Sequence, residues 1–230
     1  MADRPPAERR EALIDLYREM VDCHDCPLAA SRTNVVFGAG NADADLMFVG
    51  EAPGFYEDQQ GKPFVGRAGK LLDELLAEVG LQRGDVFIAN VLKCRPPDNR
   101  DPLPNEIESC RPYLYRQIEL IEPRVICTLG NFATKLLTGS QRGITTVHGV
   151  PQIQELGGRR VRLYPIFHPA AALRTPAMRV TLQEDFARLP ALLSEPLPEQ
   201  HAPPSAGEGP NAGDGPAAQA VLADQLGLFG

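Results

Sequence analysis

With 230 residues, 43% of them hydrophobic, the chain is long enough for one ordinary domain and a tail. It has no stretch of about eighteen apolar residues, and its first twenty residues are too charged for a signal peptide, so we expect a cytoplasmic protein with no membrane partner. The net charge of −7 does not exclude DNA binding, because residues 195–230 hold five acids and no Lys or Arg, which leaves 23 bases and 25 acids before them.

The hydrophobic pattern predicts alternating helices and strands. Apolar residues at spacings of three and four from Leu13 to Val21 indicate a first amphipathic helix. Short apolar runs at 46–49, 86–92, 125–129 and 161–167 indicate buried strands, and helical patterns lie at about 67–79, 104–121, 130–138 and 177–193. This alternation predicts an α/β fold with three layers, α/β/α, around a short central parallel sheet.

Composition divides the chain into three parts. Residues 1–194 have the pattern of a globular domain. Six Pro and four Gly occur between Glu195 and Ala218, so we expect residues 195–220 to form a disordered linker. Residues 221–230 become apolar again and form a separate C-terminal peptide.

Four cysteines are spaced like the ligands of a metal centre. Cys23 and Cys26 form a Cys-x2-Cys pair after the first helix, and Cys94 and Cys110 flank a Pro-rich loop. Grouped thiols in a reducing compartment bind metal more often than they form disulfides. The wide second spacing favours a [4Fe–4S] cluster, although spacing alone leaves zinc open. Cys127 lies inside an apolar run, which predicts a buried core residue.

The loop of the second pair carries basic side chains, at Lys93, Arg95, Arg100 and Arg111. We expect the cluster to have a structural role. It would tie this loop and the first helix to the sheet, and metal binding would offset the conformational entropy lost when these two segments become ordered. The loop is then a candidate surface for DNA phosphates, and ordinary solvated charge is the alternative.

The densest motif runs from Gly50 to Gly69, directly after a predicted strand and into a predicted helix. Its five glycines allow the backbone to approach a ligand closely, and Glu51, Phe64 and Arg67 are interleaved with them. Open parallel sheets bind ligands at the carboxyl ends of their strands. The motif therefore predicts a binding pocket at that edge.

Two more polar residues are expected at the same edge. His168 follows the strand at 161–167, and Asn90 interrupts an otherwise apolar strand, where a buried carboxamide needs hydrogen-bond partners. An aromatic plate, a carboxamide, a histidine and a carboxylate together are suited to binding a planar, amide-like heterocycle such as uracil.

These motifs resemble those of a known enzyme family. The segment GEAPGFYEDQQGKPFVGRAG resembles motif A of family 4 uracil-DNA glycosylases, HPAAALR resembles their motif B, and the similarity spans residues 8–192. It implies a monofunctional enzyme that hydrolyses the N-glycosidic bond of deoxyuridine in single- or double-stranded DNA, leaves an abasic site and initiates base excision repair. We expect a monomer, associated with the nucleoid when it acts on DNA. The implied cofactor is a [4Fe–4S] cluster, with the ligands Cys23, Cys26, Cys94 and Cys110.

The resemblance also implies roles for individual residues. Uracil flipped out of the helix stacks on Phe64, and Asn90 pairs with its O4 and N3–H edge, which rejects cytosine. A neutral His168 donates a hydrogen bond to O2 as negative charge develops there, assisted by backbone amides of motif A from Gly50 onward. Glu51 orients water or supports the cationic sugar.

Selectivity and DNA distortion have weaker signals. Tyr56 or Glu57 is the candidate wall that excludes the methyl group of thymine. The family commonly has a wedge leucine four residues after the motif B histidine, but this chain has Ala172 there, so Leu173 or Arg174 is the candidate for that role.

The C-terminal peptide resembles the QLxLF motif by which bacterial DNA enzymes bind the sliding clamp. Gln225 supplies a polar anchor, and Leu226, Leu228 and Phe229 supply apolar side chains for a groove.

Two other functions are compatible with these patterns. One is a catalytically silent, cluster-bearing accessory domain that binds DNA, and the other is a glycosylase of wider range that acts on hypoxanthine or ethenocytosine.

Overall fold

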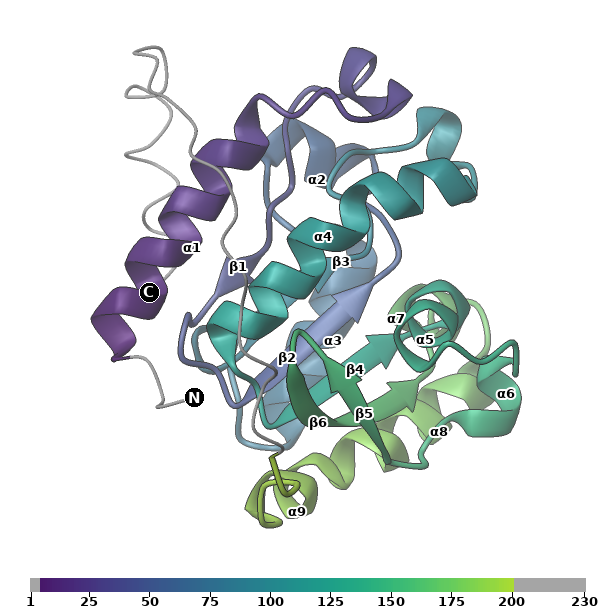
Figure 1. Ribbon diagram of the computed structural model, residues 1–230. Helices are drawn as coiled ribbons and strands as arrows, with labels where there is room; N and C mark the ends of the chain where they lie inside the picture. Colours follow the sequence, from purple (N-terminus) through teal and green to yellow (C-terminus); the bar gives the residue numbers. More distant parts are fainter. Residues whose placement is uncertain (1–4, 201–230) are drawn as a thin grey trace.

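The structure, a computed structural model, describes residues 5–200 (Figure 1). A six-stranded sheet with the order β1-β3-β2-β4-β6-β5 forms its centre. The four inner strands are parallel, as predicted: β2 (Leu46–Gly50), β3 (Phe87–Asn90), β4 (Val125–Leu129) and β6 (Arg159–Ile166). The two edge strands, β1 (Ala39–Gly40) and β5 (Gln152–Leu156), are antiparallel and were not predicted.

Helices cover both faces of the sheet, which confirms the predicted three layers. Figure 1 shows α1 (Pro6–Val21) and α4 (Pro104–Ile121) side by side across one face, where α5 (Asn131–Thr138) also packs. The other face is covered by α3 (Arg67–Glu78), α8 (Pro176–Ala187) and α9 (Leu189–Ser194). Alternation along β2 divides the core, because Met47 packs with the first group and Phe48 with the second.

Short helices complete the layers. They are α2 (Phe55–Gln60), α6 (Ile144–Val147) and α7 (Pro169–Ala172), with 3-10 turns η1 (Pro27–Ala30), η2 (Arg83–Asp85) and η3 (Pro97–Asn99). The helix predicted at 177–193 is divided between α8 and α9 at Arg188, and Pro190 lies in the first turn of α9, where the missing amide is tolerated.

The parallel strands all end at one edge of the sheet. Gly50 at the end of β2 lies in register with Asn90 at the end of β3. Glu51 directly follows β2, and His168 follows β6 after one intervening residue. Residues 39 to 118 positions apart in sequence are therefore brought to a single edge by the topology.

The folded domain makes contacts beyond residue 194. Arg162 forms an ion pair with Glu195 at 2.8 Å, and the Gln200 side chain accepts from the Arg160 amide and donates to the Arg160 carbonyl, at 3.0 and 2.8 Å. The rest of the predicted linker and the peptide 221–230 lie outside the described residues. Within residues 5–200, no helix has the length and apolar character needed to span a bilayer.

Candidate active site and cysteine centre

A pocket of about 600 Å³ lies at the carboxyl edge of the parallel strands. The predicted residues that line it are Glu51, Glu57, Phe64, Asn90, His168 and Arg174. Its volume is within the range usual for small-molecule sites, so a single nucleobase fits inside.

The Phe64 ring is held by a constrained loop. Phe64 has a backbone φ of +53°, a left-handed conformation that is unusual for a bulky residue. Arg83 donates to the carbonyls of Pro63, at 3.0 Å, and of Phe64. A Cβ at Gly69 would lie 1.7 Å from the Phe64 carbonyl oxygen, so only glycine permits this approach. The surroundings therefore fix the ring, which is buried and has its centroid 5.6 Å from that of His168.

Gly50 leaves the space in which two site residues meet. A Cβ there would lie 2.4 Å from Oδ1 of Asn90 and 2.8 Å from Cζ of Phe64. Any side chain at this position would displace the carboxamide, the ring or both.

Asn90 presents an unsatisfied acceptor. Its side chain is 2% exposed, and its Oδ1 receives no hydrogen bond from any donor in residues 5–200. Its backbone carbonyl accepts from Nζ of Lys93 at 2.9 Å. A buried oxygen without a donor costs free energy, so a ligand with an N–H at this position would be stabilised by it.

His168 is arranged as a neutral donor. Its Nδ1 accepts a hydrogen bond from the backbone amide of Ala170 at 3.1 Å, so the proton of the neutral ring resides on Nε2. Burial lowers the pKa of His168 to about 4. The imidazole is therefore uncharged near neutral pH.

Glu51 is the carboxylate with a perturbed pKa in this pocket. Burial, and then the negative charge of Asp101, raise the pKa of Glu51 to about 7. It therefore changes charge in the neutral range, unlike an ordinary glutamate.

Glu57 closes the loop that carries Phe64. Its Oε1 accepts from the backbone amides of Val65 and Gly66, both at 3.0 Å. This carboxylate fixes α2 against the second half of the motif and also lines the pocket.

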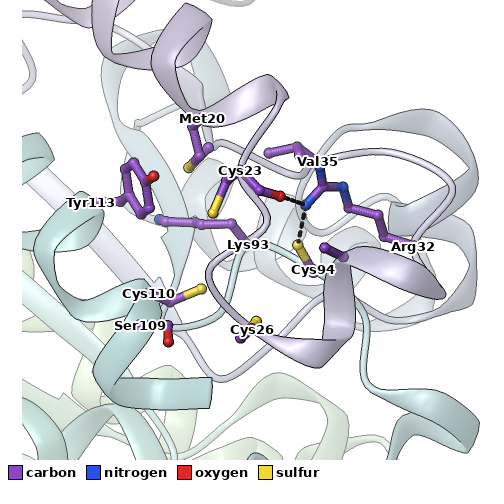
Figure 2. Close-up of a pocket in the computed structure, with 11 residues that line it drawn as sticks. Met20, Cys23, Cys26, Arg32, Val35, Lys93, Cys94, Ser109, Cys110 and Tyr113 are labelled. Carbon is purple, nitrogen blue, oxygen red and sulfur yellow. Dashed lines mark hydrogen bonds between the residues drawn. The ribbon is translucent and has the colours of Figure 1, made fainter. Parts of the chain in front are cut away.

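The four predicted cysteine ligands lie around one enclosed cavity (Figure 2). Cys23 follows α1, Cys26 precedes η1, Cys94 follows β3 and Cys110 lies within α4. Figure 2 shows their sulfur atoms around a common space. The fifth cysteine, Cys127, is fully buried in β4, as predicted.

Comparison with known proteins identifies the family. The family model described as the uracil DNA glycosylase superfamily matches residues 37–190. The type-4 uracil-DNA glycosylase of Archaeoglobus fulgidus is 47% identical over 82% of this chain and 96% of its own length. Those of Saccharolobus solfataricus and Thermotoga maritima are 48% and 47% identical, over 80% and 81% of this chain and 88% and 97% of their own lengths. The chain belongs to the type-4 uracil-DNA glycosylase family.

Four thiols face one cavity in this type-4 family member. Within the described part of the chain, no three cysteine, histidine or acidic side chains are arranged to hold one metal ion. Ligands of a structural zinc converge at about 2.3 Å from the ion, whereas a multi-iron cluster holds its thiolates further apart around a larger body. Four thiols around a shared space are chemically able to bind metal.

Two basic side chains adjoin the cavity. Arg32 donates to Sγ of Cys94 at 3.5 Å and to the Cys23 carbonyl at 2.7 Å. Lys93 is fully buried, and no carboxylate in residues 5–200 pairs with it. Burial lowers the pKa of Lys93 to about 7, whereas the charges of Cys110 and Cys94 raise it. Basic groups beside grouped thiols fit an anionic centre.

The prediction that the basic loop contacts DNA phosphates is wrong for Lys93, because this side chain is buried behind the cysteines. Arg100 forms a bidentate pair with Glu106 at 2.9 and 2.5 Å, and Arg111 pairs with Glu108 at 2.7 Å.

Three predicted site residues, Gly50, Tyr56 and Leu173, lie outside the pocket lining. Tyr56 is 62% exposed, and Leu173 is 37% exposed at the end of α7, whereas Ala172 beside it is buried. Of the two candidates for the thymine-excluding wall, Glu57 alone lines the pocket.

Sequence reasoning missed two polar residues of the pocket. Asn99 and Asp101 line it from the irregular loop between Cys94 and Cys110. No periodicity marks them, and the stretch NRD looks like ordinary solvated loop. Asn99 lies three residues and Asp101 one residue before Pro102, which is a local sign of an ordered turn.

Proposed function

We propose that this chain excises uracil from DNA with the pocket of Glu51, Phe64, Asn90 and His168 as its active site. The observation that carries the proposal is the pair of complementary groups in one pocket, namely the unsatisfied Oδ1 of Asn90 and the neutral His168 ring with its proton on Nε2. Enzymes that act on a base remove it from the stack first, because the target atom is inaccessible inside a duplex.

Asn90 would distinguish uracil from cytosine. Its Oδ1 accepts from N3–H of uracil and its Nδ2 donates to O4, while Phe64 stacks on the face of the ring. Cytosine presents an acceptor at N3 and an amino group at C4, so both hydrogen bonds would be mismatched. Buried mismatches of this kind support rejection by large factors.

His168 would stabilise the leaving group. Breaking the glycosidic bond places negative charge on uracil, largely at O2, and a neutral Nε2–H donor meets that charge without having to lose a proton first. Backbone amides of motif A, beginning at Gly50, would add donors. Each preorganised donor of this type is worth about 100- to 1000-fold in rate.

Glu51 would act on the other product of bond cleavage. In its ionised form the carboxylate orients the attacking water and supports the positive charge on the sugar. Its pKa of about 7 means that this form is populated near neutral pH.

Glu57 would provide selectivity against thymine, and the end of α7 would distort the DNA duplex. Glu57 lines the pocket and is fixed by two backbone amides, which suits a rigid wall near C5 of the base. Leu173 is exposed, whereas Ala172 is buried and Arg174 lines the pocket; these exposures favour Leu173 over Ala172 as the residue that would enter the duplex.

The cysteine centre would be structural. A [4Fe–4S] cluster would be held by Cys23, Cys26, Cys94 and Cys110, and it would join the end of α1, the chain before η1, the chain after β3 and α4. When bound, it supplies a cross-link between these segments, and base excision is carried out by the pocket residues.

Base release from short oligonucleotides tests the proposed function. Single- and double-stranded oligonucleotides bearing uracil, thymine, hypoxanthine or cytosine are incubated with the protein, and abasic sites are quantified. We expect release of uracil alone. The variant Asn90→Leu combined with His168→Ala should lose release, whereas the matched pair Asn105→Leu and His24→Ala, at exposed positions, should retain it.

Two outcomes would contradict the proposal. Undiminished release by the double pocket variant would show that these groups are not the active site. Absence of abasic sites with every substrate would favour the silent accessory domain, and release of hypoxanthine would indicate the wider-range enzyme.

We also propose that the C-terminal peptide binds a bacterial sliding clamp. The motif Gln225-Leu226-Gly-Leu228-Phe229 follows the predicted Pro- and Gly-rich linker 195–220. The sequence predicts a linker of about 25 residues, and a flexible chain of that length would have a mean reach near 30 Å, enough for two proteins on one duplex. In a pull-down, Phe229→Ala should abolish clamp binding and Leu222→Ala, outside the motif, should not. Unchanged binding by the Phe229 variant would refute the proposal.

A further inference from the structure

Two neighbouring aromatic side chains are exposed beside the pocket. Phe55 and Tyr56, the first residues of α2, are 51% and 62% exposed. Among residues 5–200 they are the only aromatic side chains with such exposure. The residues on either side of them, Gly54 and Glu57, line the pocket, so the two rings lie at its rim.

The two rings belong to one arrangement with a cation. Their centroids are 5.5 Å apart, with an angle of 80° between the ring planes. The Arg95 guanidinium lies 5.2 Å from the Phe55 centroid, and its Nε donates to Oδ1 of Asn99, which lines the pocket, at 2.7 Å. In the part of the chain that the structure describes, no carboxylate pairs with Arg95. Its charge therefore remains available for a phosphate or a base.

Nothing in the fold requires these rings to be exposed. Contiguous exposed apolar surface on a soluble protein usually marks an interaction site. Aromatic rings next to a basic side chain are the combination by which proteins bind unpaired nucleic acid, since every base has a face for stacking and every nucleotide a phosphate. A uracil in the pocket remains joined to nucleotides on both sides, and at least one of them must pass over the rim.

We propose that Phe55, Tyr56 and Arg95 form a stacking platform for the base adjacent to the flipped uracil in an unpaired strand. The proposal rests on the proposed function and specifies the substrate further. In a duplex the adjacent base stays stacked and paired, so the platform favours single-stranded DNA. Tyr56 then has a role at the mouth of the pocket, and not in the wall of the pocket where the sequence analysis placed it.

A cycle that removes each partner in turn tests the platform. The protein partner is removed by the variant Phe55→Ala/Tyr56→Ala, and the DNA partner by an abasic analogue placed 5′ or 3′ of the uracil. Loss of one base–aromatic stack should lower kcat/KM on the single-stranded substrate by roughly 5- to 150-fold. The wild type should show this loss with the abasic analogue on one side, and the variant should show no further loss there.

Matched variants separate stacking from general effects. Val180→Ala removes an apolar side chain that is 55% exposed on α8, away from the pocket lining, and should change nothing. Tyr56→Phe keeps the ring and should retain most of the wild-type value. The duplex substrate should respond less than the single strand. Equal thermal unfolding of the variants shows that they are folded.

Two results would overturn the platform. Independent, multiplicative losses from the variant and from both abasic positions would show that the rings and the adjacent base do not meet. A wild-type kcat/KM for the double variant on single-stranded DNA would do the same while leaving uracil excision intact. If the wild type releases no uracil, the proposed function fails instead, and the same cycle is then read from binding of the single-stranded oligonucleotides by fluorescence anisotropy.

Discussion

Replacing Asp101 with Asn should shift the pH dependence of uracil release. Burial and the Asp101 charge hold the pKa of Glu51 at about 7, compared with an ordinary value of 4.5. A carboxyl group with a pKa of 7 is about 9% ionised at pH 6 and about 91% at pH 8, so a rate that needs the carboxylate rises about tenfold across this interval. At an ordinary pKa the group is already about 97% ionised at pH 6, and the rise vanishes.

Asp101→Asn removes the smaller of the two causes that raise the pKa of Glu51. The midpoint of the increase in rate should therefore move to lower pH without reaching the ordinary glutamate pKa. Asp101 is solvent-exposed, so its influence on Glu51 is screened by ions and the shift should shrink at high salt. The titration of His168, at about 4, lies below this range and does not distort it.

Single-turnover release from a single-stranded uracil oligonucleotide, measured from pH 5 to 9 at low salt, reports the midpoint. Glu51→Gln should abolish the rise. The matched control Asp98→Asn changes an exposed acid of the same loop that does not line the pocket, and should leave the midpoint in place. A midpoint that stays the same in Asp101→Asn, or a rise that persists in Glu51→Gln, would refute the assignment of this carboxylate.

Gly50→Ala should lower kcat/KM for uracil release more than it lowers stability, because the new Cβ would lie 2.4 Å from the Asn90 Oδ1, and such overpacking costs about 1–3 kcal/mol. His168→Ala should reduce the single-turnover rate about 100- to 1000-fold, and an undiminished rate would contradict its role. Above pH 6.5 His168 is neutral in the folded and in the unfolded protein. Between pH 6.5 and about 4 the unfolded chain binds a proton at His168 and the native ring does not, so the free energy of unfolding of the wild type should fall by up to about 3 kcal/mol as pH falls through this range. His168→Ala should not show this loss, and urea denaturation at each pH measures it. Cys110→Ser should lose bound iron and visible absorbance together with thermal stability, whereas Cys127→Ser should keep both iron and colour; equal iron content in the two variants would exclude Cys110 as a ligand.

The inner strands and the strand-end residues were predictable from the sequence because burial produces a simple hydrophobic pattern. Strands covered on both faces appear as continuous apolar runs, and parallel strands necessarily end at one edge, which placed Glu51, Asn90 and His168 together. In the edge strand β5, partly exposed and exposed residues alternate over only four positions before the buried Leu156, too few to distinguish from loop.

The parts of the site that could not be predicted depend on tertiary placement. Successive residues of a helix differ in direction by about 100°, so the start of α2 at Phe55 decides that Tyr56 points outward and Glu57 lines the pocket. Asn99 and Asp101 reach the pocket from the loop between Cys94 and Cys110, in which Arg100 pairs with Glu106.

The short segment between Asn90 and Cys94 links the pocket to the cysteine cavity at a fixed spacing. Lys93 donates from the cysteine side to the Asn90 carbonyl at 2.9 Å and to Gln117 on α4 at 2.6 Å, and Gln117 in turn donates to the Phe37 carbonyl at 2.9 Å. One added or deleted residue in this stretch would misplace either the thiol or the amide. In the proposed active site, the hydrogen bonds of Lys93 would therefore fix Asn90, the residue proposed to pair with the base, relative to Cys94.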